Sequence, residues 1–422
     1  MTRSKNDLQF PKDWKWVKLG DVCERISNGA NVKQSDINIG FPISRIETIW
    51  NETIDLERVK YISEKDPDFV AKYSLRYNDI LFSHINSDFH LGKTAIFKSQ
   101  TSILIHGTNL LLIRLKAGVL ADYFYYQFKY KRRNGEFINV AQKSVNQSSI
   151  NQSRLKSIDF VMPPINTQQA IVSKIEELFS ELDKGVESLH KAQQQLKTYR
   201  QSVLKWAFEG RLTNVDLRKG ELPKDWRWVM LGDLCTDVEY GSSTKSKEQG
   251  EVPVLRMGNI QNGRFDWSDL VYTDDKAEID KYLLKKGDVL FNRTNSAELV
   301  GKTALFRGER PAIFAGYLIR INRIKSLIDA EYLTFYLNSH KARSYGNSVR
   351  SFGVNQSNIN GTKLKTYPIP LAPIDEQLEV VQAIESRLSV ADKLEETITQ
   401  SLQQAETLKQ SILKKAFEGK LI

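Results

Sequence analysis

The sequence predicts an α+β protein in which two tandem copies of one mixed module are separated by two long helices. Three observations support this prediction. The segment QSVLKWAFEGRL at 201–212 returns as QSILKKAFEGKL at 410–421, with nine of twelve residues identical at an offset of 209. The segment FPKDWKWVKLGDVC at 10–23 returns as LPKDWRWVMLGDLC at 222–235, with ten of fourteen residues identical. Each copy also contains a long run of regularly spaced apolar residues. The chain is therefore a duplicated unit, a globular module followed by a helix.

The two helices are expected at 163–212 and 372–422. Apolar residues recur there every three and four positions over about five heptads, which is typical of helices that pack as a coiled coil. Each helix begins after a proline and ends at a glycine, Gly210 or Gly419. If the termini of a module lie close together, the two helices must pair antiparallel. This arrangement places a module at each end of the rod, related by pseudo-two-fold symmetry.

The remaining segments are module one, residues 1–162, and module two, residues 213–371. Short runs rich in isoleucine, valine, phenylalanine and tyrosine alternate there with polar and glycine-containing turns, which predicts short strands. In module one the strands are expected at 79–85, 94–99, 102–107 and 109–115. Helices are expected at 121–131 and, in module two, at 330–340. The modules share two further motifs, GKTAIF and GKTALF at 92–97 and 301–306, and NQSSIN and NQSNIN at 146–151 and 355–360.

The charge distribution indicates a polyanionic partner. The chain of 422 residues has a net charge of +10. Residues 1–160 carry a net charge of +7 and residues 213–370 a net charge of +5, whereas the helical stretches together carry −2. A basic balance on two separate modules favours nucleic acid. No signal peptide or membrane span is expected, and the cytoplasm is the expected compartment. The two cysteines, Cys23 and Cys235, occupy equivalent positions and are interpreted as small buried apolar residues.

The sequence predicts no catalytic residue and no metal site. The GKT motif lacks the glycine of a phosphate-binding loop five positions upstream, because Ser87 and Ser296 stand there. The segment MPPI at 162–165 lacks both the polar first residue and the aromatic residue of an adenine methyltransferase motif. The five histidines share no ligand spacing.

The loops that differ between the two copies are the candidate DNA-binding elements. Residues 28–33 align with 240–247, residues 84–90 with 293–299, and residues 142–147 with 351–356. These loops carry arginine, asparagine and glutamine, the side chains that read base edges. The alternative is that they are drifting surface loops. The candidate contact residues are Lys33, Arg45, His84, Asn86 and Lys143 in module one and Lys245, Arg256, Asn292, Arg293 and Arg350 in module two.

Two further sets of residues admit two interpretations each. Trp14 and Trp16, with Trp226 and Trp228, are interpreted as core anchors, with base stacking as the alternative. Apolar residues beside the heptad seam widen the apolar stripe, which predicts docking of partner subunits. The alternative is packing against the chain's own modules. The candidate docking residues are Val172, Phe179, Val381 and Leu388.

The order of these motifs resembles the DNA specificity subunit of type I restriction–modification systems. The shared pattern is an opening LPxxW…LGD, an internal GKTAxF, NQS.IN, and a helix entered through proline, all duplicated. Ala372 departs from it at the second helix entrance. The resemblance implies that each module is a target recognition domain reading half of a bipartite site in double-stranded DNA. It also implies that the helices dock two methyltransferase subunits, to which restriction subunits add. S-adenosylmethionine and ATP would then belong to the partners, with no cofactor bound by this chain. Two alternatives stay open, a stand-alone regulator that binds a split site and a self-sufficient DNA-modifying enzyme.

Overall fold

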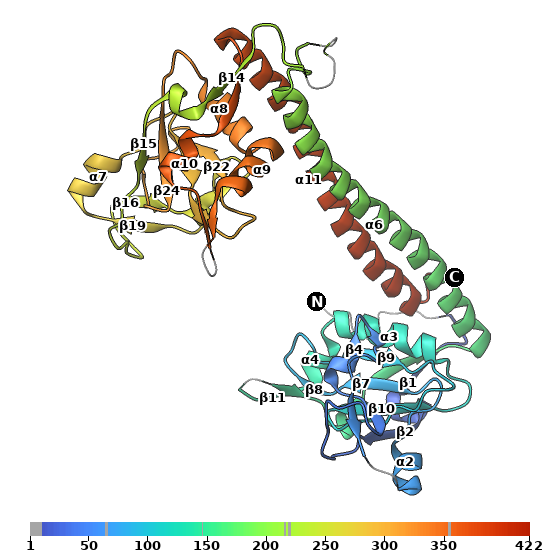
Figure 1. Ribbon diagram of the computed structural model, residues 1–422. Helices are drawn as coiled ribbons and strands as arrows, with labels where there is room; N and C mark the ends of the chain where they lie inside the picture. Colours follow the sequence, from blue (N-terminus) through green and yellow to red (C-terminus); the bar gives the residue numbers. More distant parts are fainter. Residues whose placement is uncertain (1–10, 64–65, 146, 215–216, 218–220, 353–355) are drawn as a thin grey trace. The chain divides into compact units, whose positions relative to one another are not determined.

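Apart from β23 (Ile313–Phe314), which only the second copy forms, the two copies share one order of helices and strands in the computed structural model, which describes residues 11–63, 66–145, 147–214, 217, 221–352 and 356–422 (Figure 1). The chain divides into two units, Met1–Leu189 with Gln400–Ile422 and His190–Thr399. Unit one contains module one, the beginning of the first long helix and the end of the second. Unit two contains module two, the end of the first long helix and the beginning of the second.

Unit one is built on an antiparallel four-stranded sheet of order β2-β10-β7-β9. Smaller sheets pair β1 with β13, β3 with β6 and β4 with β5, and a three-stranded sheet has the order β11-β12-β8. Its strands are β1 (Lys15–Lys18), β2 (Cys23–Asn28), β3 (Phe41–Ile43), β4 (Ile49–Trp50), β5 (Thr53–Ile54), β6 (Lys60–Ile62), β7 (Ile80–Ser83), β8 (Ile85–Asn86), β9 (Thr94–Ile96), β10 (Leu110–Leu115), β11 (Gln142–Lys143), β12 (Ser148–Ser149) and β13 (Asp159–Met162). Its helices are α1 (Leu19–Val22), the 3-10 turn η2 (Ile46–Thr48), α2 (Pro67–Tyr73), α3 (Ala121–Arg133), α4 (Glu136–Val140) and α5 (Gln152–Lys156).

Unit two repeats this plan with a four-stranded antiparallel sheet of order β15-β24-β20-β22. Its smaller sheets are β14-β27, β19-β16-β23, β17-β18 and β21-β26-β25. Its strands are β14 (Arg227–Met230), β15 (Cys235–Tyr240), β16 (Val252–Leu255), β17 (Ile260–Gln261), β18 (Arg264–Phe265), β19 (Val271–Thr273), β20 (Val289–Asn292), β21 (Thr294–Asn295), β22 (Thr303–Leu305), β23 (Ile313–Phe314), β24 (Leu318–Arg323), β25 (Ser351–Phe352), β26 (Ser357–Asn358) and β27 (Pro368–Leu371). Its helices are η3 (Leu231–Leu234), η4 (Met257–Asn259), α7 (Lys276–Tyr282), α8 (Ala330–Leu337), α9 (His340–Val349) and α10 (Gly361–Lys365).

The central sheet of unit one is buried on both faces, which explains why its strands are continuously apolar. Along β10, Leu111 and Ile113 pack into the core that contains α3, whereas Leu110 and Leu112 pack into a second cluster on the opposite face. A strand with only one buried face would alternate apolar and polar residues. The central sheet of unit two is also buried on both faces. Along β20, Val289 and Phe291 pack into one core and Leu290 packs into the other.

One predicted strand is absent, and one predicted helix is shorter than expected. Residues 102–107 form no strand, because Ile105 makes only isolated bridges to Ile43 and Ser74. Its equivalent in module two, β23, does pair in parallel with β16. The helix predicted at 330–340 is confirmed as α8 (Ala330–Leu337) but ends three residues early, and a second helix, α9, begins at His340. The hydroxyl of Ser339 accepts a hydrogen bond from the N–H of Ala342 at 3.3 Å and caps the second helix.

The two long helices are α6 (Ile165–Phe208) and α11 (Ile374–Phe417), each of 44 residues. Both end as the glycines predict. Gly210 and Gly419 have φ of 75° and 72°, the left-handed conformation that terminates helices. The following N–H groups, of Arg211 and Lys420, each bond at 2.8 Å to the carbonyl five residues earlier.

The long helices are antiparallel in each unit, because the beginning of one shares a core with the end of the other, and ion pairs also join them. In unit one, Lys409 of α11 donates to Asp183 of α6 at 2.5 Å. In unit two, Arg200 of α6 contacts Asp392 at 2.6 Å and Glu395 at 2.8 Å. A later position on α6 thus faces an earlier position on α11, as antiparallel helices require. These exposed pairs identify the direction, but they contribute little stability.

A buried glutamine joins each long helix to the module from which it emerges. The Gln168 side chain is fully buried at the beginning of α6. Its amide nitrogen donates to the carbonyls of Gly118 and Pro163, both at 3.0 Å, and its oxygen accepts from the N–H of Leu120 at 3.0 Å. Leu120 is the residue immediately before α3, so one amide connects three segments.

Gln377 makes the same joint in unit two. Its nitrogen donates to the carbonyls of Leu327 at 2.9 Å and Ala372 at 2.8 Å, and its oxygen accepts from the N–H of Asp329 at 2.8 Å. Asp329 caps α8, which is the equivalent of α3. Because a buried amide without partners is costly, each glutamine fixes the direction in which its helix leaves the module.

The far end of each helix completes the core of the other module. At the end of α11, Phe417 packs edge-on against Tyr123 of α3, with ring centroids 5.5 Å apart. At the end of α6, Phe208 packs against Tyr332 at 5.1 Å and Tyr336 at 5.0 Å on α8. The segments at 201–212 and 410–421 are alike because both fill the same kind of site.

The exchange of helix ends predicts a matched pair of destabilised variants. Phe417→Ala should destabilise unit one, and Phe208→Ala should destabilise unit two, each by about 3–5 kcal/mol as expected for a buried phenylalanine. Hydrogen exchange of the α3 and α8 amides measures the two effects separately. Loss of protection at α8 in Phe417→Ala, with α3 unchanged, would contradict the assignment.

Candidate nucleic-acid interface

The small sheet β11-β12-β8 brings together two of the loops that differ between the modules. Asn86 of β8 pairs with Ser148 of β12, which pairs in turn with Lys143 of β11. The hairpin that carries β11 projects from the module (Figure 1). The sequence-predicted residues Asn86 and Lys143 therefore lie in one row across this sheet, although 57 positions separate them in the chain. Asn146 of this hairpin and residues 353–355 of its counterpart lie outside the described residues.

A turn at residues 87–91 is fixed beside this sheet. The carboxylate of Asp88 accepts from the hydroxyl of Ser148 and lies 3.6 Å from the ammonium of Lys143. The guanidinium of Arg132, on α3, donates to the carbonyls of Phe89 at 2.7 Å and Leu91 at 3.1 Å. The loop is therefore held from both sides, and its exposed side chains are presented on a defined backbone.

Module two builds the same sheet with other residues. The Asn358 amide of β26 donates to the Thr294 hydroxyl of β21 at 2.7 Å. The guanidinium of Arg350, at the entrance to β25, donates to the carbonyl of Ala297 at 2.9 Å and to the side chain of Asn347 at 2.8 Å. Arg350 thus anchors the turn of module two from a different position than Arg132 in module one.

The other basic candidates lie at equivalent places in the two modules. Lys33 and Lys245 are exposed in the loops that follow β2 and β15. Arg45 and Arg256 are half-buried at the beginning of the 3-10 turns η2 and η4. Arg45 lies 3.3 Å from Glu47, and Arg256 lies 3.0 Å from Asp269.

Two candidates are turned into the protein. The Asn292 side chain is fully buried, where its amide donates to the carbonyl of Leu299 at 3.3 Å and its oxygen accepts from the N–H of Thr294 at 3.3 Å. His84 is buried as well, and burial lowers the pKa of its imidazole to about 4. Neither side chain reaches the surface in this conformation, so both are withdrawn as DNA contacts. Asn292 instead stabilises the base of the loop.

Arg293 lies at the boundary between core and surface. Its guanidinium carbon is 4.7 Å from the centre of the Tyr240 ring, and one nitrogen donates to the carbonyl of Gly316 at 3.4 Å. Its Nε is buried without a hydrogen-bond partner. Stacking on tyrosine orients the guanidinium while leaving donors available to an acceptor.

The tryptophans divide into two kinds. Trp226 is buried, and its indole N–H donates to Glu376 of α11 at 2.8 Å. Trp14 packs against the core of unit one. The second member of each pair, Trp16 or Trp228, is exposed, and the ammonium of Lys341 lies 4.0 Å from the centre of the Trp228 ring. The prediction of core anchors is therefore right for the first of each pair and wrong for the second.

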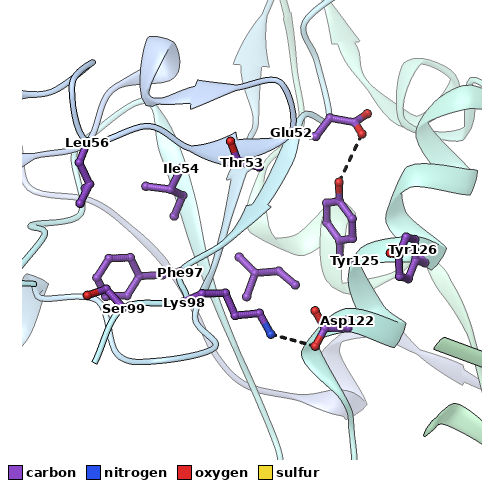
Figure 2. A pocket seen from close by; sticks show the side chains of 11 residues that line it. Glu52, Thr53, Ile54, Leu56, Phe97, Lys98, Ser99, Asp122, Tyr125 and Tyr126 are labelled. Atoms are coloured by element: carbon purple, nitrogen blue, oxygen red, sulfur yellow. Dashed lines mark hydrogen bonds and ion pairs between the residues drawn. The ribbon is translucent and has the colours of Figure 1, made fainter. Parts of the chain in front are cut away.

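A pocket of about 580 Å³ opens in unit one between β5, β9 and α3 (Figure 2). Its two carboxylates are already engaged. Glu52 accepts from the Tyr125 hydroxyl at 3.3 Å and pairs with Lys129, and Asp122 pairs with Lys98 at 2.8 Å. In the aligned copy the positions of Glu52 and Tyr125 are Gly263 and Thr334. The pocket thus belongs to module one, and its lining contains no free acid–base pair. The lining residues are Glu52, Thr53, Ile54, Leu56, Ile96, Phe97, Lys98, Ser99, Asp122, Tyr125 and Tyr126.

Comparison with known proteins identifies the family. The model of the type I restriction modification DNA specificity domain matches the chain twice, at residues 11–194 and 223–404. The chain belongs to this family. The putative type I restriction enzyme MjaX specificity subunit of Methanocaldococcus jannaschii is 31% identical over 98% of this chain and 95% of its own length. The type I restriction enzyme EcoBI specificity subunit of Escherichia coli is 25% identical over 96% of this chain and 86% of its own length.

Solved structures confirm the fold class of this specificity-family protein. A chain from a study of complex assembly and conformational transition of the type I R-M system superposes with a TM-score of 0.76 at 19% identity. The alignment covers 98% of this chain and 100% of that chain. The HsdS subunit from Thermoanaerobacter tengcongensis superposes with a TM-score of 0.61 at 18% identity, covering 99% of this chain and 100% of that chain. The α+β prediction, with two tandem modules and two long paired helices, is correct.

The four candidate docking residues of this family member pack against its own modules. Phe179 is buried against Tyr126 of α3, with ring centroids 5.9 Å apart. Val381 is buried in the core of unit two, and Val172 and Leu388 pack against the cores of their units. Phe179 and Val381 are therefore buried within their own units, whereas Val172 and Leu388 keep part of their surface exposed.

The sequence interpretation did not single out two exposed apolar side chains at the candidate interface. The Phe89 side chain is 77% exposed on the anchored turn, and Val145 is 99% exposed in the β11–β12 hairpin. Both lie in the candidate loops, beside the polar residues predicted to contact DNA. For Phe89 the available signal was an aromatic residue in the polar turn that follows Asn86.

In the described part of the chain, no cluster of three or more His, Cys, Asp or Glu residues has the arrangement of a metal site. Nor does any helix there combine the length and apolar character that a bilayer crossing requires. Cys23 and Cys235 are buried free thiols, and burial raises the pKa of Cys23 to about 12.

The buried histidines of unit one predict a loss of stability in mild acid. Burial lowers the pKa of His84 and of His106 to about 4, whereas the pKa of an unfolded histidine is about 6.5. The unfolded chain therefore takes up protons first as the pH falls below about 6.5. Stability should decrease by roughly 3 kcal/mol per histidine between pH 7 and pH 4.

Urea unfolding of the wild type and of the His84→Gln/His106→Gln double variant at several pH values measures this contribution. The variant should lose less stability than the wild type over the same interval. If the free energy of unfolding changes equally with pH in both proteins, burial does not lower the pKa of either imidazole.

Proposed function

We propose that this chain is the DNA specificity subunit of a type I restriction–modification complex and reads an asymmetric, split DNA sequence. The observation that carries the proposal is the pair of equivalent modules in which one framework supports unlike loops. The framework positions the loop sheets β11-β12-β8 and β21-β26-β25 in the same way. Different side chains on the same framework favour different half-sequences.

Each module, residues 1–162 or 213–371, is proposed to be one target recognition domain. The basic balance of both modules suits the phosphate backbone, and the loops supply donors and acceptors for base edges. After removal of the two buried side chains, the proposed DNA contacts are Lys33, Arg45, Asn86 and Lys143 in module one and Lys245, Arg256, Arg293 and Arg350 in module two.

The proposal assigns chemistry to other subunits. Double-stranded DNA, methyltransferase subunits and restriction subunits are the proposed partners, and S-adenosylmethionine and ATP would be bound by those subunits. The chain itself acts by recognition, in the cytoplasm. Two methyltransferase subunits per chain are proposed because the two copies of the repeat offer two equivalent surfaces.

We propose that the exposed apolar positions of the long helices contact these subunits. Tyr199 of α6 and Leu408 of α11 occupy equivalent positions at the offset of 209, and their side chains are 40% and 48% exposed. Trp206, seven residues after Tyr199 and therefore on the same helix face, is exposed as well. Exposed aromatic and leucine side chains at heptad spacing are suited to a protein partner.

A module exchange tests independent reading. Replacement of residues 1–162 by the matching segment of a relative should change one half of the methylated sequence and leave the other half intact. Methylation mapping of DNA from cells that contain the chain and its methyltransferase measures the outcome. If the chain alone methylates DNA, or if no methyltransferase copurifies with it, the proposed division of labour fails.

Docking is tested by paired charge substitutions on the helices. Tyr199→Asp with Leu408→Asp should reduce copurification of the methyltransferase at least tenfold, because a carboxylate would be buried in an apolar contact. Gln194→Asp with Gln403→Asp is the matched control, because these exposed glutamines are also related by the offset of 209. Equal recovery of the complex from both variants would show that Tyr199 and Leu408 are not part of the docking surface.

A further inference from the structure

The GKT motif of each module forms the base of a candidate DNA-reading loop. In module one, the N–H of Ser83 donates to the carbonyl of Lys93, and the N–H of Gly92 donates to the carbonyl of Ser83, both at 2.8 Å. In module two, Asn292 replaces Ser83 and makes the same two bonds with Lys302 and Gly301, again at 2.8 Å. The loop between these residues differs between modules, whereas the lysine is the same.

In module one an arginine is fixed beside this lysine. The two donors of Arg132 that bond to the carbonyls of Phe89 and Leu91 hold its guanidinium against the turn that immediately precedes Lys93. Burial and the charge of Arg132 lower the pKa of Lys93, whereas the carboxylate of Glu52 raises it. Glu52 is itself paired with Lys129, and its carboxylate also lies 4.0 Å from the guanidinium of Arg132.

In module two the lysine contacts a neutral side chain. The Lys302 ammonium donates to the side-chain oxygen of Gln261 at 3.4 Å. Burial and the charge of Arg343, on α9, lower the pKa of Lys302. The residue equivalent to Glu52 is Gly263, so module two has no carboxylate at that position.

A nearby pair of basic residues provides the contrast. Lys98 and Arg307 follow the GKT lysines by five positions and are paired with carboxylates, Asp122 at 2.8 Å and Glu331 at 2.9 Å. Within the described residues, neither GKT lysine forms an ion pair with a carboxylate. Both modules therefore pair one framework cation with a carboxylate and leave the GKT lysine without such a partner. A lysine without a carboxylate partner is available to an external anion.

We propose that the GKT lysines, Lys93 and Lys302, bind phosphate groups of the DNA backbone, one in each module. The inference rests on the proposed function and deepens it. A phosphate contact at the base of the loop fixes the duplex against the framework whatever bases the loop reads. A site that must serve any target sequence belongs on residues shared by both modules, and the GKT lysines are shared.

The test is the salt dependence of DNA binding by the complex of the chain with its methyltransferase. Lys93→Gln and Lys302→Gln are made singly and together. Each lost phosphate contact should reduce the slope of log K against log salt by about 0.9 and the affinity roughly eightfold at 0.1 M salt. Target and unrelated duplexes should be weakened equally, and the methylated sequence should stay the same. Lys93→Arg with Lys302→Arg should retain the wild-type slope.

Lys12→Gln with Lys224→Gln is the matched control, because these exposed lysines occupy equivalent positions in the segments that lead into β1 and β14. It should leave the slope unchanged. An unchanged slope in a folded Lys93→Gln/Lys302→Gln variant would overturn the inference. So would a loss of discrimination between target and unrelated DNA, since the lysines would then read bases. A wild-type complex with no preference for any sequence would overturn the proposed function itself.

Discussion

The buried glutamines at the beginnings of the long helices are the interaction on which both units depend. Gln168 and Gln377 each satisfy two carbonyls and one N–H from the module with a single side-chain amide. Three polar backbone groups would otherwise be buried without partners, at a cost of about 1–3 kcal/mol each. A planar amide can bond to all three backbone groups in only one orientation. The side chain therefore fixes the direction of the long helix relative to its module. A short proline-containing entrance alone would not give that constraint.

The C-terminal ends of the long helices exchange core residues between the two repeats. Each core is completed by a phenylalanine that belongs to the repeat of the other module, Phe417 in unit one and Phe208 in unit two. Tyr123 and Tyr332 receive these rings and donate their hydroxyls to the carbonyls of Val161 and Pro370, on the strands that lead into the long helices. The same tyrosine therefore contacts the incoming end of one helix and the connection to the other. A single copy of the repeat would leave this site empty.

The sequence predicted the parts of the structure that local patterns determine. Heptad spacing located both long helices, glycines located their ends, and the strands β7, β9 and β10 followed from short runs rich in β-branched and aromatic residues. Long-range pairing determined what the sequence did not show. Backbone groups within 102–107 bond to separate segments, including Pro42 of β3 and Tyr73 of α2, instead of along one neighbouring strand. Ser339 interrupts a helical pattern by capping a new helix. At the interface, comparison of the two copies located the loops, but the inward direction of His84 and Asn292 depends on pairing across the fold.

The same structural logic explains how one framework carries different loops. The loop at residues 84–92 is closed by hydrogen bonds between backbone atoms, so Ser83 in one module and Asn292 in the other are equally compatible with it. The arginine that anchors the turn also differs in position, because Arg132 in module one and Arg350 in module two reach equivalent turns from different elements. Side chains at the loop surface, such as Phe89 in module one and Glu298 in module two, carry no part of this closure. These side chains can therefore change without breaking the bonds that close the loop.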